Sequence, residues 1–190
     1  MKMPTYISDN VTHVRWLIMY SYARAAFALL WAITAFKAAQ HSDAISTVLL
    51  VCYPLWDAFA NAADGARSGG LRENKTQAIN VIVSLPAAVT VAVALPNMNQ
   101  TIAIFGVWAI LSGLLQLATA LRRWWEYSAQ WPMALSGAQP TLAGTLFVFL
   151  SGAPGEMTID VIAAYAGFGA FYFLVSALLL SSSASPRDSM

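Results

Sequence analysis

Charged residues and cysteines are scarce in this chain, and each scarcity excludes a class of protein. Only 10% of the 190 residues are charged, whereas 58% are hydrophobic. A typical soluble domain has about 25% charged residues, so a water-soluble globule is a poor fit. The formal net charge of +1 excludes a strongly basic nucleic-acid-binding domain, because such domains have pI values above about 9. The single cysteine, Cys52, allows neither an internal disulfide nor a paired-cysteine site, and we expect it to be a buried packing residue.

Catalytic and cofactor-binding motifs are also lacking, and we predict no enzymatic activity, no cofactor and no metal. The two histidines, His13 and His41, lie at opposite ends of the first apolar segment, so they cannot share a metal ion. Neither HExxH nor GxSxG occurs in the chain. No lysine lies inside an apolar segment, which excludes a retinal-type Schiff base.

Long apolar segments dominate what the chain does contain. A membrane-spanning helix needs about 20 consecutive, mostly apolar residues. Six segments qualify, at residues 14–36, 44–64, 77–95, 102–121, 131–150 and 161–181. The stretches between them carry the turn-forming and charged residues typical of loops. We therefore predict an all-α polytopic membrane protein, with residues 1–181 as a single six-helix domain and residues 182–190 as a polar, disordered tail.

Internal similarity predicts that these spans form three helical hairpins, at residues 14–64, 77–121 and 131–181. Residues 105–113 (FGVWAILSG) in the fourth span resemble residues 168–176 (FGAFYFLVS) in the sixth, and residues 53–56 are a fainter copy in the second. Each hairpin would begin on the same side of the membrane, which gives a parallel-repeat topology. The alternative is that apolar helices look alike by composition alone.

The distribution of Lys and Arg predicts the orientation of the chain. If both termini lie on one side, only Lys37 falls in a loop on the opposite side. The termini side then carries Lys2, Arg15, Arg67, Arg72, Lys75, Arg122, Arg123 and Arg187. We predict a multi-pass protein of the bacterial inner (plasma) membrane with both termini in the cytoplasm.

Arg24 and Asp57 are charged residues well inside predicted spans, where a charge is costly unless it is paired. At 1.5 Å per helical residue, their depths in the bilayer differ by roughly 5 Å. Because the first two spans should be neighbours, we expect a buried ion pair between them. Two roles are open for this pair: a structural clasp that fixes helix packing, or a relay for protons or ions.

Further polar residues are predicted in the cytoplasmic half of spans two to five. They are Asn61, Asp64, Asn80, Gln116 and Gln139. Asp57, Asn61 and Asp64 share one helix face, because they are spaced i, i+4 and i+7. These side chains either hydrogen-bond between helices or line a cytoplasm-facing vestibule that ends at Asp57.

Small residues and prolines inside the spans affect how the helices pack and bend. The glycines at a spacing of seven residues are Gly106 and Gly113 in the fourth span and Gly137 and Gly144 in the fifth. Such positions let two helix backbones approach closely, within one chain or between copies. The prolines inside predicted spans, which should kink their helices, are Pro54, Pro86 and Pro140.

The chain resembles the HdeD-like family of small integral membrane proteins. The resemblance lies in the three-hairpin layout, in residues 105–117 (Phe-Gly-x-Trp-x-x-Leu-x-Gly-x-x-Gln-Leu) and in the Arg122–Arg123 pair that follows. It covers residues 14–181 and implies an association with bacterial acid resistance, but no catalytic or binding residues come with it. The second span is richer in acidic residues than the general pattern of that family.

Three functions follow from these observations and remain open. The leading one is a non-enzymatic, HdeD-like inner-membrane protein with a stress-related, assembly or structural role through helix packing. The second is a small channel or a proton- or ion-coupled transporter that uses Arg24 and Asp57. The third is an accessory subunit of a larger membrane complex. The expected surroundings are the lipid bilayer, together with further copies of the chain or other membrane subunits, and no nucleic acid.

Overall fold

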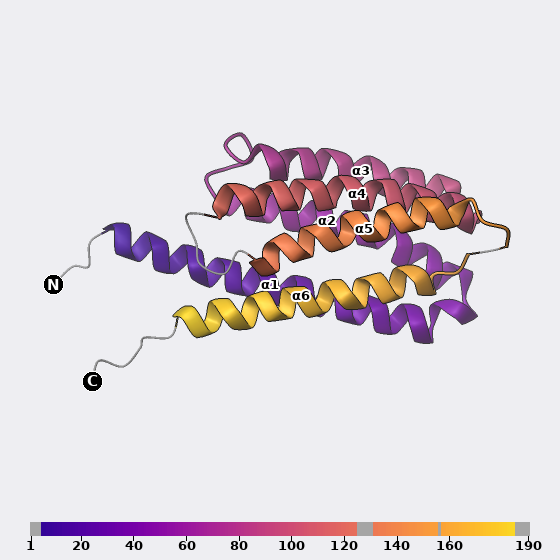
Figure 1. Cartoon of the computed structure of the whole chain (residues 1–190), viewed down its shortest axis with the longest axis horizontal. Helices are drawn as coiled ribbons and strands as arrows, with labels where there is room; N and C mark the ends of the chain where they lie inside the picture. Colours follow the sequence, from indigo (N-terminus) through magenta and orange to yellow (C-terminus); the bar gives the residue numbers. More distant parts are fainter. Residues whose placement is uncertain (1–4, 125–130, 156, 185–190) are drawn as a thin grey trace.

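The computed structural model describes residues 5–124, 131–155 and 157–184, and all the longer regular elements in these residues are α-helices (Figure 1). Each helix coincides with one of the apolar segments of the sequence, so the predicted all-α class is confirmed. The helices are α1 (Thr5–Lys37), α2 (Asp43–Arg67), α3 (Lys75–Ala94), α4 (Met98–Arg123), α5 (Trp131–Ser151) and α6 (Asp160–Ala184), with a short 3-10 helix, η1 (Ala39–His41), between α1 and α2.

At both ends of the described chain, a helix extends beyond the apolar segment that predicts it. α1 begins at Thr5 rather than at residue 14, because no glycine or proline interrupts residues 5–37 and the backbone hydrogen bonds continue past the apolar part. α6 runs through residues 182–184, which the sequence analysis wrongly assigns to the disordered tail. The Ser182 hydroxyl donates to the carbonyl of Leu179, so a polar residue still joins the helix. Residues 185–190 of the predicted tail lie outside the described residues.

The turn between α2 and α3 is held by glycines and by one asparagine. Gly69 and Gly70 have φ angles of +98° and +97°, a region that residues with a side chain rarely adopt. The Asn74 side-chain amide donates to the carbonyls of Ser68 (2.6 Å) and Gly70 (3.0 Å). This turn brings α3 back alongside α2.

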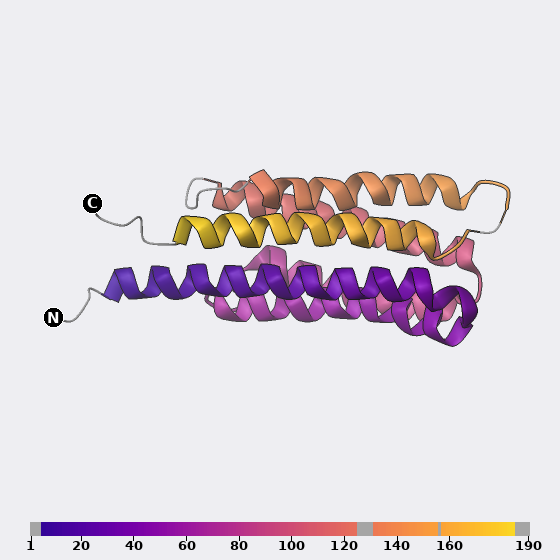
Figure 2. The ribbon, with the colours of Figure 1, turned by 90° about the horizontal axis from the view of Figure 1, so that it is seen from below.

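The six helices pack as a ring in chain order, and α1 closes the ring against α6 (Figures 1 and 2). Both ends of the chain lie at the same end of the bundle. The most extensive contacts join α4 to α5, α1 to α6 and α2 to α3, whereas α1 and α2 have the least contact of any neighbouring pair in the ring. These extensive contacts fall between the predicted hairpins rather than within them, and the hairpin repeat stays a prediction.

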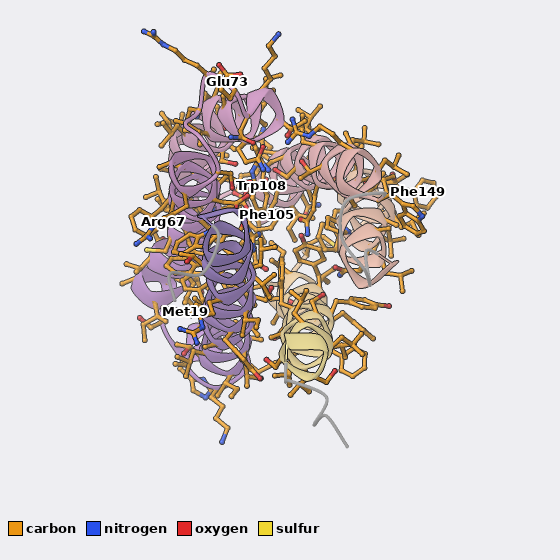
Figure 3. All side chains as sticks on the ribbon, turned by 90° about the vertical axis from the view of Figure 1, so that its left-hand side faces the viewer. Met19, Arg67, Glu73, Phe105, Trp108 and Phe149 are labelled. Carbon is orange, nitrogen blue, oxygen red and sulfur yellow. The ribbon has the colours of Figure 1, made fainter. Side chains whose placement is uncertain are left out.

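Aromatic side chains fill the centre of the ring. Tyr53 lies among the rings of Trp31, Phe105, Trp108 and Tyr165, with centroid separations of 5.0, 5.7, 5.8 and 6.2 Å respectively. Phe105 and Trp108 lie inside the bundle when it is viewed along the helices (Figure 3). Tyr53 and Phe105 begin two of the three similar segments noted in the sequence. Phe168, which begins the third, is 63% exposed, so the three copies do not occupy equivalent positions.

The outer surface of the bundle is apolar. Large hydrophobic side chains such as Met19, Val93 and Phe149 are exposed, and Figure 3 shows Met19 and Phe149 on the periphery. Polar side chains such as Asp57 and Ser84 are buried instead. Five helical segments of the described chain are long and apolar enough to cross a membrane: Val14–Lys37, Asp43–Arg67, Lys75–Ala94, Met98–Arg122 and Asp160–Ser182. This inside-out distribution is typical of a membrane protein.

Glycines allow the close packing of α4 against α5. A Cβ atom on Gly106 would lie 2.7 Å from the carbonyl oxygen of Gly144, and one on Gly113 would lie 2.6 Å from that of Gly137. The two helices run antiparallel, so the seven-residue spacing on one matches the same spacing on the other. Within a single chain, these four glycines therefore bring two backbones together, as one of the two sequence-based alternatives states.

The expectation that Cys52 is buried is wrong, and the three prolines inside predicted spans do not end their helices. Cys52 is exposed on α2 rather than buried, because the inward face of that turn is taken by the larger ring of Tyr53. Pro54, Pro86 and Pro140 all lie inside continuous helices.

Substitution of Gly144 by alanine tests the α4–α5 contact. The added Cβ meets the carbonyl oxygen of Gly106 on the facing helix, and such overpacking costs about 1–3 kcal/mol. We expect Gly144→Ala to lower the thermal unfolding temperature in detergent. The matched control is Gly167→Ala on α6, where a Cβ meets nothing within 4 Å and should leave the protein equally or more stable. Equal behaviour of the two variants would contradict the packing account.

Candidate functional site

Arg24 on α1 and Asp57 on α2 form an ion pair inside the helix bundle. The Nη2 of Arg24 is 2.6 Å from Oδ1 of Asp57, and the two side chains are only 12% and 6% exposed. The contact expected from the sequence is therefore present. The Nη1 of Arg24 donates to the Tyr20 hydroxyl (3.0 Å), and the guanidinium lies 4.6 Å from the centroid of the Phe173 ring on α6. This cation–π contact adds a third helix to the environment of the arginine.

A hydrogen-bond network extends from the carboxylate of Asp57 to α3 and α4. Its second oxygen, Oδ2, lies 3.1 Å from the Ser84 hydroxyl, which accepts a hydrogen bond from the indole of Trp108 (2.9 Å). The oxygen Oδ1 of Asn80 lies 3.1 Å from that same hydroxyl and accepts from Ser112 (3.0 Å). Ser84 has one proton, so it donates either to Asp57 or to Asn80, and the charged carboxylate is the stronger acceptor.

A second polar cluster surrounds Asp64, two helical turns from Asp57 toward the termini end. Oδ1 of Asp64 accepts from the indole of Trp16 (3.3 Å), and Oδ2 accepts from the Gln77 amide (2.9 Å). The sequence analysis places Asp64 in the polar group but pairs it with none of these residues. Arg67 lies 5.0 Å from the centroid of the Trp16 ring, so a cation borders this cluster.

The remaining residues of the predicted polar group divide into two kinds. The Asn61 amide donates to the backbone carbonyl of Asp57 (2.9 Å), a bond within its own helix rather than between helices. The Gln139 amide on α5 donates to the carbonyl of Tyr165 on α6 (3.2 Å), which is the interhelical bonding that one sequence-based alternative describes. Gln116 and Gln139 also border a small cavity beside the ion pair.

This cavity has a volume of about 30 Å³, room for about one or two water molecules. It is a water-sized space at Asp57 rather than a wide vestibule. Its polar lining comprises Arg24, Asp57, Ser112, Gln116 and Gln139, and its aromatic lining comprises Tyr53, Trp108, Tyr165 and Phe173.

The residues that the sequence analysis did not place in the site are neutral and polar. They are Trp16, Tyr20, Gln77, Ser84, Trp108 and Ser112. A weak signal was available for some of them. Tyr20 is four residues before Arg24, and Ser84 is four residues after Asn80, so each shares a helix face with a residue of the predicted group. Serine and tryptophan are too common in membrane helices for this spacing to single them out.

Metal binding has no support in the described part of the chain. No group of three or more His, Cys, Asp or Glu side chains lies close enough to hold a metal ion there. His13 is in the N-terminal part of α1, and His41 is in η1 beyond the other end of α1.

Comparison with known proteins gives no relative: no family model matches the chain, and neither a curated protein nor a solved structure is significantly similar to it. The resemblance to HdeD-like proteins therefore stays a prediction from short motifs.

A double-mutant cycle tests the coupling of Arg24 and Asp57. Loss of one partner leaves a buried charge unpaired, which costs about 3–5 kcal/mol. We expect Asp57→Asn and Arg24→Met each to lower the stability of the protein in detergent strongly. The double variant should be more stable than the sum of the two losses predicts, because no charge is then stranded.

The control for this cycle is Asp43→Asn, which removes an exposed carboxylate from the first turn of the same helix and should change stability by less than about 1 kcal/mol. Strictly additive losses in the double variant would show that the two side chains do not interact.

Proposed function

We propose that the chain is a non-enzymatic inner-membrane protein in which the Arg24–Asp57 pair is a structural clasp for the helix bundle. The observation that carries this proposal is that the pair is enclosed and its partners are complete on the carboxylate side. Oδ1 of Asp57 accepts from Arg24 and Oδ2 from Ser84. A paired, hydrogen-bonded charge is a stable arrangement in a low-dielectric interior, whereas either charge alone is not.

The clasp compensates for the weakest contact of the ring. α1 and α2 have the least contact of the neighbouring helices, yet the ion pair joins these two. Through Ser84, Trp108 and Asn80 the same pair reaches α3 and α4. Four consecutive helices are thus fixed by one connected set of polar contacts, which suits a protein whose role is to assemble and persist in the membrane.

We further propose that α5 is the sixth membrane span. It has 21 residues, which corresponds to about 31 Å at 1.5 Å per residue, and none of them is charged. It lies in close contact with α4 along its length. Six spans are consistent with both termini at one end of the bundle. Basic side chains of a loop and of adjoining helix ends gather at that end (Arg67, Arg72, Lys75 and Arg122), which favours a cytoplasmic location for the termini.

A stress-related role, as in the HdeD-like family, is the physiological setting that we propose for this clasp. Its support is the motif at residues 105–117. Further copies of the chain or other membrane subunits are the partners that an assembly role predicts, and co-purification in a mild detergent is the direct assay for them.

A second candidate function is proton- or ion-coupled transport through the bundle. The observation in its favour is the polar cavity of about 30 Å³ that contacts both Arg24 and Asp57. A carboxylate beside a water-sized space can exchange protons, which a fully packed clasp cannot do.

Reconstitution into liposomes separates these two functions. If the pair is a clasp, the wild-type protein shows no proton or ion flux above empty liposomes, and Asp57→Asn mainly lowers its thermal stability. If the pair is a relay, the wild type conducts and Asp57→Asn abolishes the flux while the protein stays folded. Measured flux in the wild type that Asp57→Asn removes would overturn the clasp as the main function.

Labelling with a membrane-impermeant maleimide tests the orientation. On a Cys52→Ser background, cysteine replaces exposed Glu73 at the termini end or exposed Asp43 at the opposite end. We expect Asp43→Cys to react in intact cells and Glu73→Cys to react only after permeabilisation. The reverse pattern would place the termini outside the cytoplasm.

A further inference from the structure

We propose that α1 and α6 swing as one unit away from the other four helices, and that this hinge motion opens the polar core to water at the termini end. The Arg24–Asp57 clasp describes the closed arrangement. A hinge goes beyond it, because it states where the bundle opens and which contacts keep it shut.

The helix contacts divide the ring into two units. α1 packs extensively against α6, whereas the α1–α2 and α5–α6 contacts are the two least extensive between neighbouring helices of the ring. Figure 2 shows α1 and α6 side by side. We call α1 and α6 the helix pair, α2 to α5 the four-helix layer, and the boundary between the two units the seam.

Side-chain size accounts for this division. Small residues let two helix backbones pack closely, and α1 and α6 each bury four alanines: Ala25, Ala28, Ala32 and Ala35 on α1, and Ala163, Ala166, Ala170 and Ala177 on α6. Across the seam, α1 meets α2 through large side chains. The ring of Phe27 stacks on that of Trp56 (4.6 Å), and Trp31 contacts Tyr53 edge to face (5.0 Å). Closely packed backbones move together, whereas an interface of long side chains can separate.

Both chain connections across the seam lie at the end opposite the termini (Figure 1). Residues 38–42 join α1 to α2 there, and residues 152–159 join α5 to α6. The α2–α3 and α4–α5 connections, at the termini end, each join two helices of the four-helix layer. The helix pair is therefore attached at one end only, which is the arrangement of a hinge.

Hydrogen bonds strengthen the hinge end. The Asn99 amide on α4 donates to the carbonyl of Gly155 (3.0 Å), and its oxygen accepts from the backbone N–H of Met157 (2.9 Å). The Ser46 hydroxyl on α2 donates to the carbonyl of Ala39 (2.8 Å). These bonds tie both connections to helices of the layer, so the motion of the pair is a rotation about this end.

Polar contacts close the termini half of the seam. The Trp16 indole donates to Asp64 (3.3 Å), and Arg24 lies 2.6 Å from Asp57. In a dry interior such contacts are costly to break. Where water can enter, it replaces the lost partners, and a wet ion pair contributes little. The polar half therefore separates more easily than the aromatic half around Tyr53.

The cavity of about 30 Å³ lies on this seam. Arg24, Tyr165 and Phe173 border it from the helix pair, whereas Asp57 and Ser112 border it from the layer. Packing between the two units is thus incomplete beside the ion pair. In the closed arrangement, the polar side chains of the layer contact only a water-sized space, and rotation of the helix pair would open that space to the termini side.

Cysteine reactivity measures this opening. On a Cys52→Ser background, Ser112→Cys places a buried thiol beside the cavity. The matched control is Thr101→Cys, which replaces a fully buried hydroxyl without a hydrogen-bond partner on the same helix, near the hinge end. Sulfonatoethyl methanethiosulfonate is charged and larger than the cavity, so it reacts only with an opened site.

The reagent is added to the purified full-length variants in detergent, and the rates are divided by those in denaturant. We expect Ser112→Cys to react at least about tenfold faster than Thr101→Cys, because a local opening exposes one and global unfolding exposes both. If Ser112→Cys does not fold, Gln116→Cys, one turn further along α4 on the same cavity, replaces it as the probe.

Two tryptophan variants locate the hinge, because both indoles donate from α1 to α2. Trp16→Phe removes the bond to Asp64 near the termini end, and Trp31→Phe removes a 2.7 Å bond to the carbonyl of Leu49 near the hinge. We expect Trp16→Phe to raise the reaction rate of Ser112→Cys about fivefold, the effect of one hydrogen bond on an opening equilibrium. Trp31→Phe should change that rate by less than about twofold, although it lowers thermal stability.

Three results would overturn the hinge. Equal rates for Ser112→Cys and Thr101→Cys would indicate global unfolding. Absence of reaction at Ser112→Cys, even with Trp16→Phe, would show that the seam stays shut. A larger effect of Trp31→Phe than of Trp16→Phe would place the opening at the other end. The stability coupling of Arg24 and Asp57 is measured independently, so failure of the hinge and failure of the clasp are distinguishable.

Discussion

The mutual neutralisation of Arg24 and Asp57 inside an apolar bundle is the interaction on which the other features depend. Neither side chain can remain charged alone in such an interior without a large loss of free energy. Their 2.6 Å contact joins the two helices that otherwise touch least. Once these helices are fixed, Ser84 and Trp108 are in position to complete the partners of the carboxylate, and the aromatic centre closes around Tyr53.

Much of this arrangement could be predicted from the sequence, because two strong physical constraints are visible in it. Apolar segments of about 20 residues predict the helices, and all six occur. Two isolated charges at similar depths predict a pair, and Arg24 and Asp57 are in contact. The paired seven-residue glycine spacings predict a close helix contact, and Gly106 and Gly113 face Gly144 and Gly137 across the α4–α5 contact.

Other features could not be predicted, because they depend on which helix faces which. The sequence suggests hairpins, whereas the most extensive contacts lie between them, including the α1–α6 contact between the two ends of the chain. Phe168 resembles Phe105 in its local sequence but is exposed on α6. Ser84 is part of the site through its position relative to Asp57 and Trp108, and its four-residue spacing from Asn80 is too weak a signal to predict that position.

The two roles considered for the polar core make different demands on the same residues. A clasp needs every partner of the pair to be satisfied, and the carboxylate of Asp57 meets this requirement. A relay needs an unsatisfied group and a space nearby; the Nε of Arg24 has no hydrogen-bond partner, and the Arg24 side chain borders the small cavity. Both roles begin from an ionised Asp57. Isotope-edited infrared spectroscopy of the wild type and of Asp57→Asn at neutral pH measures that state directly. The ion pair predicts a carboxylate stretching band that the variant lacks; a protonated carboxylic acid band in its place would contradict the account.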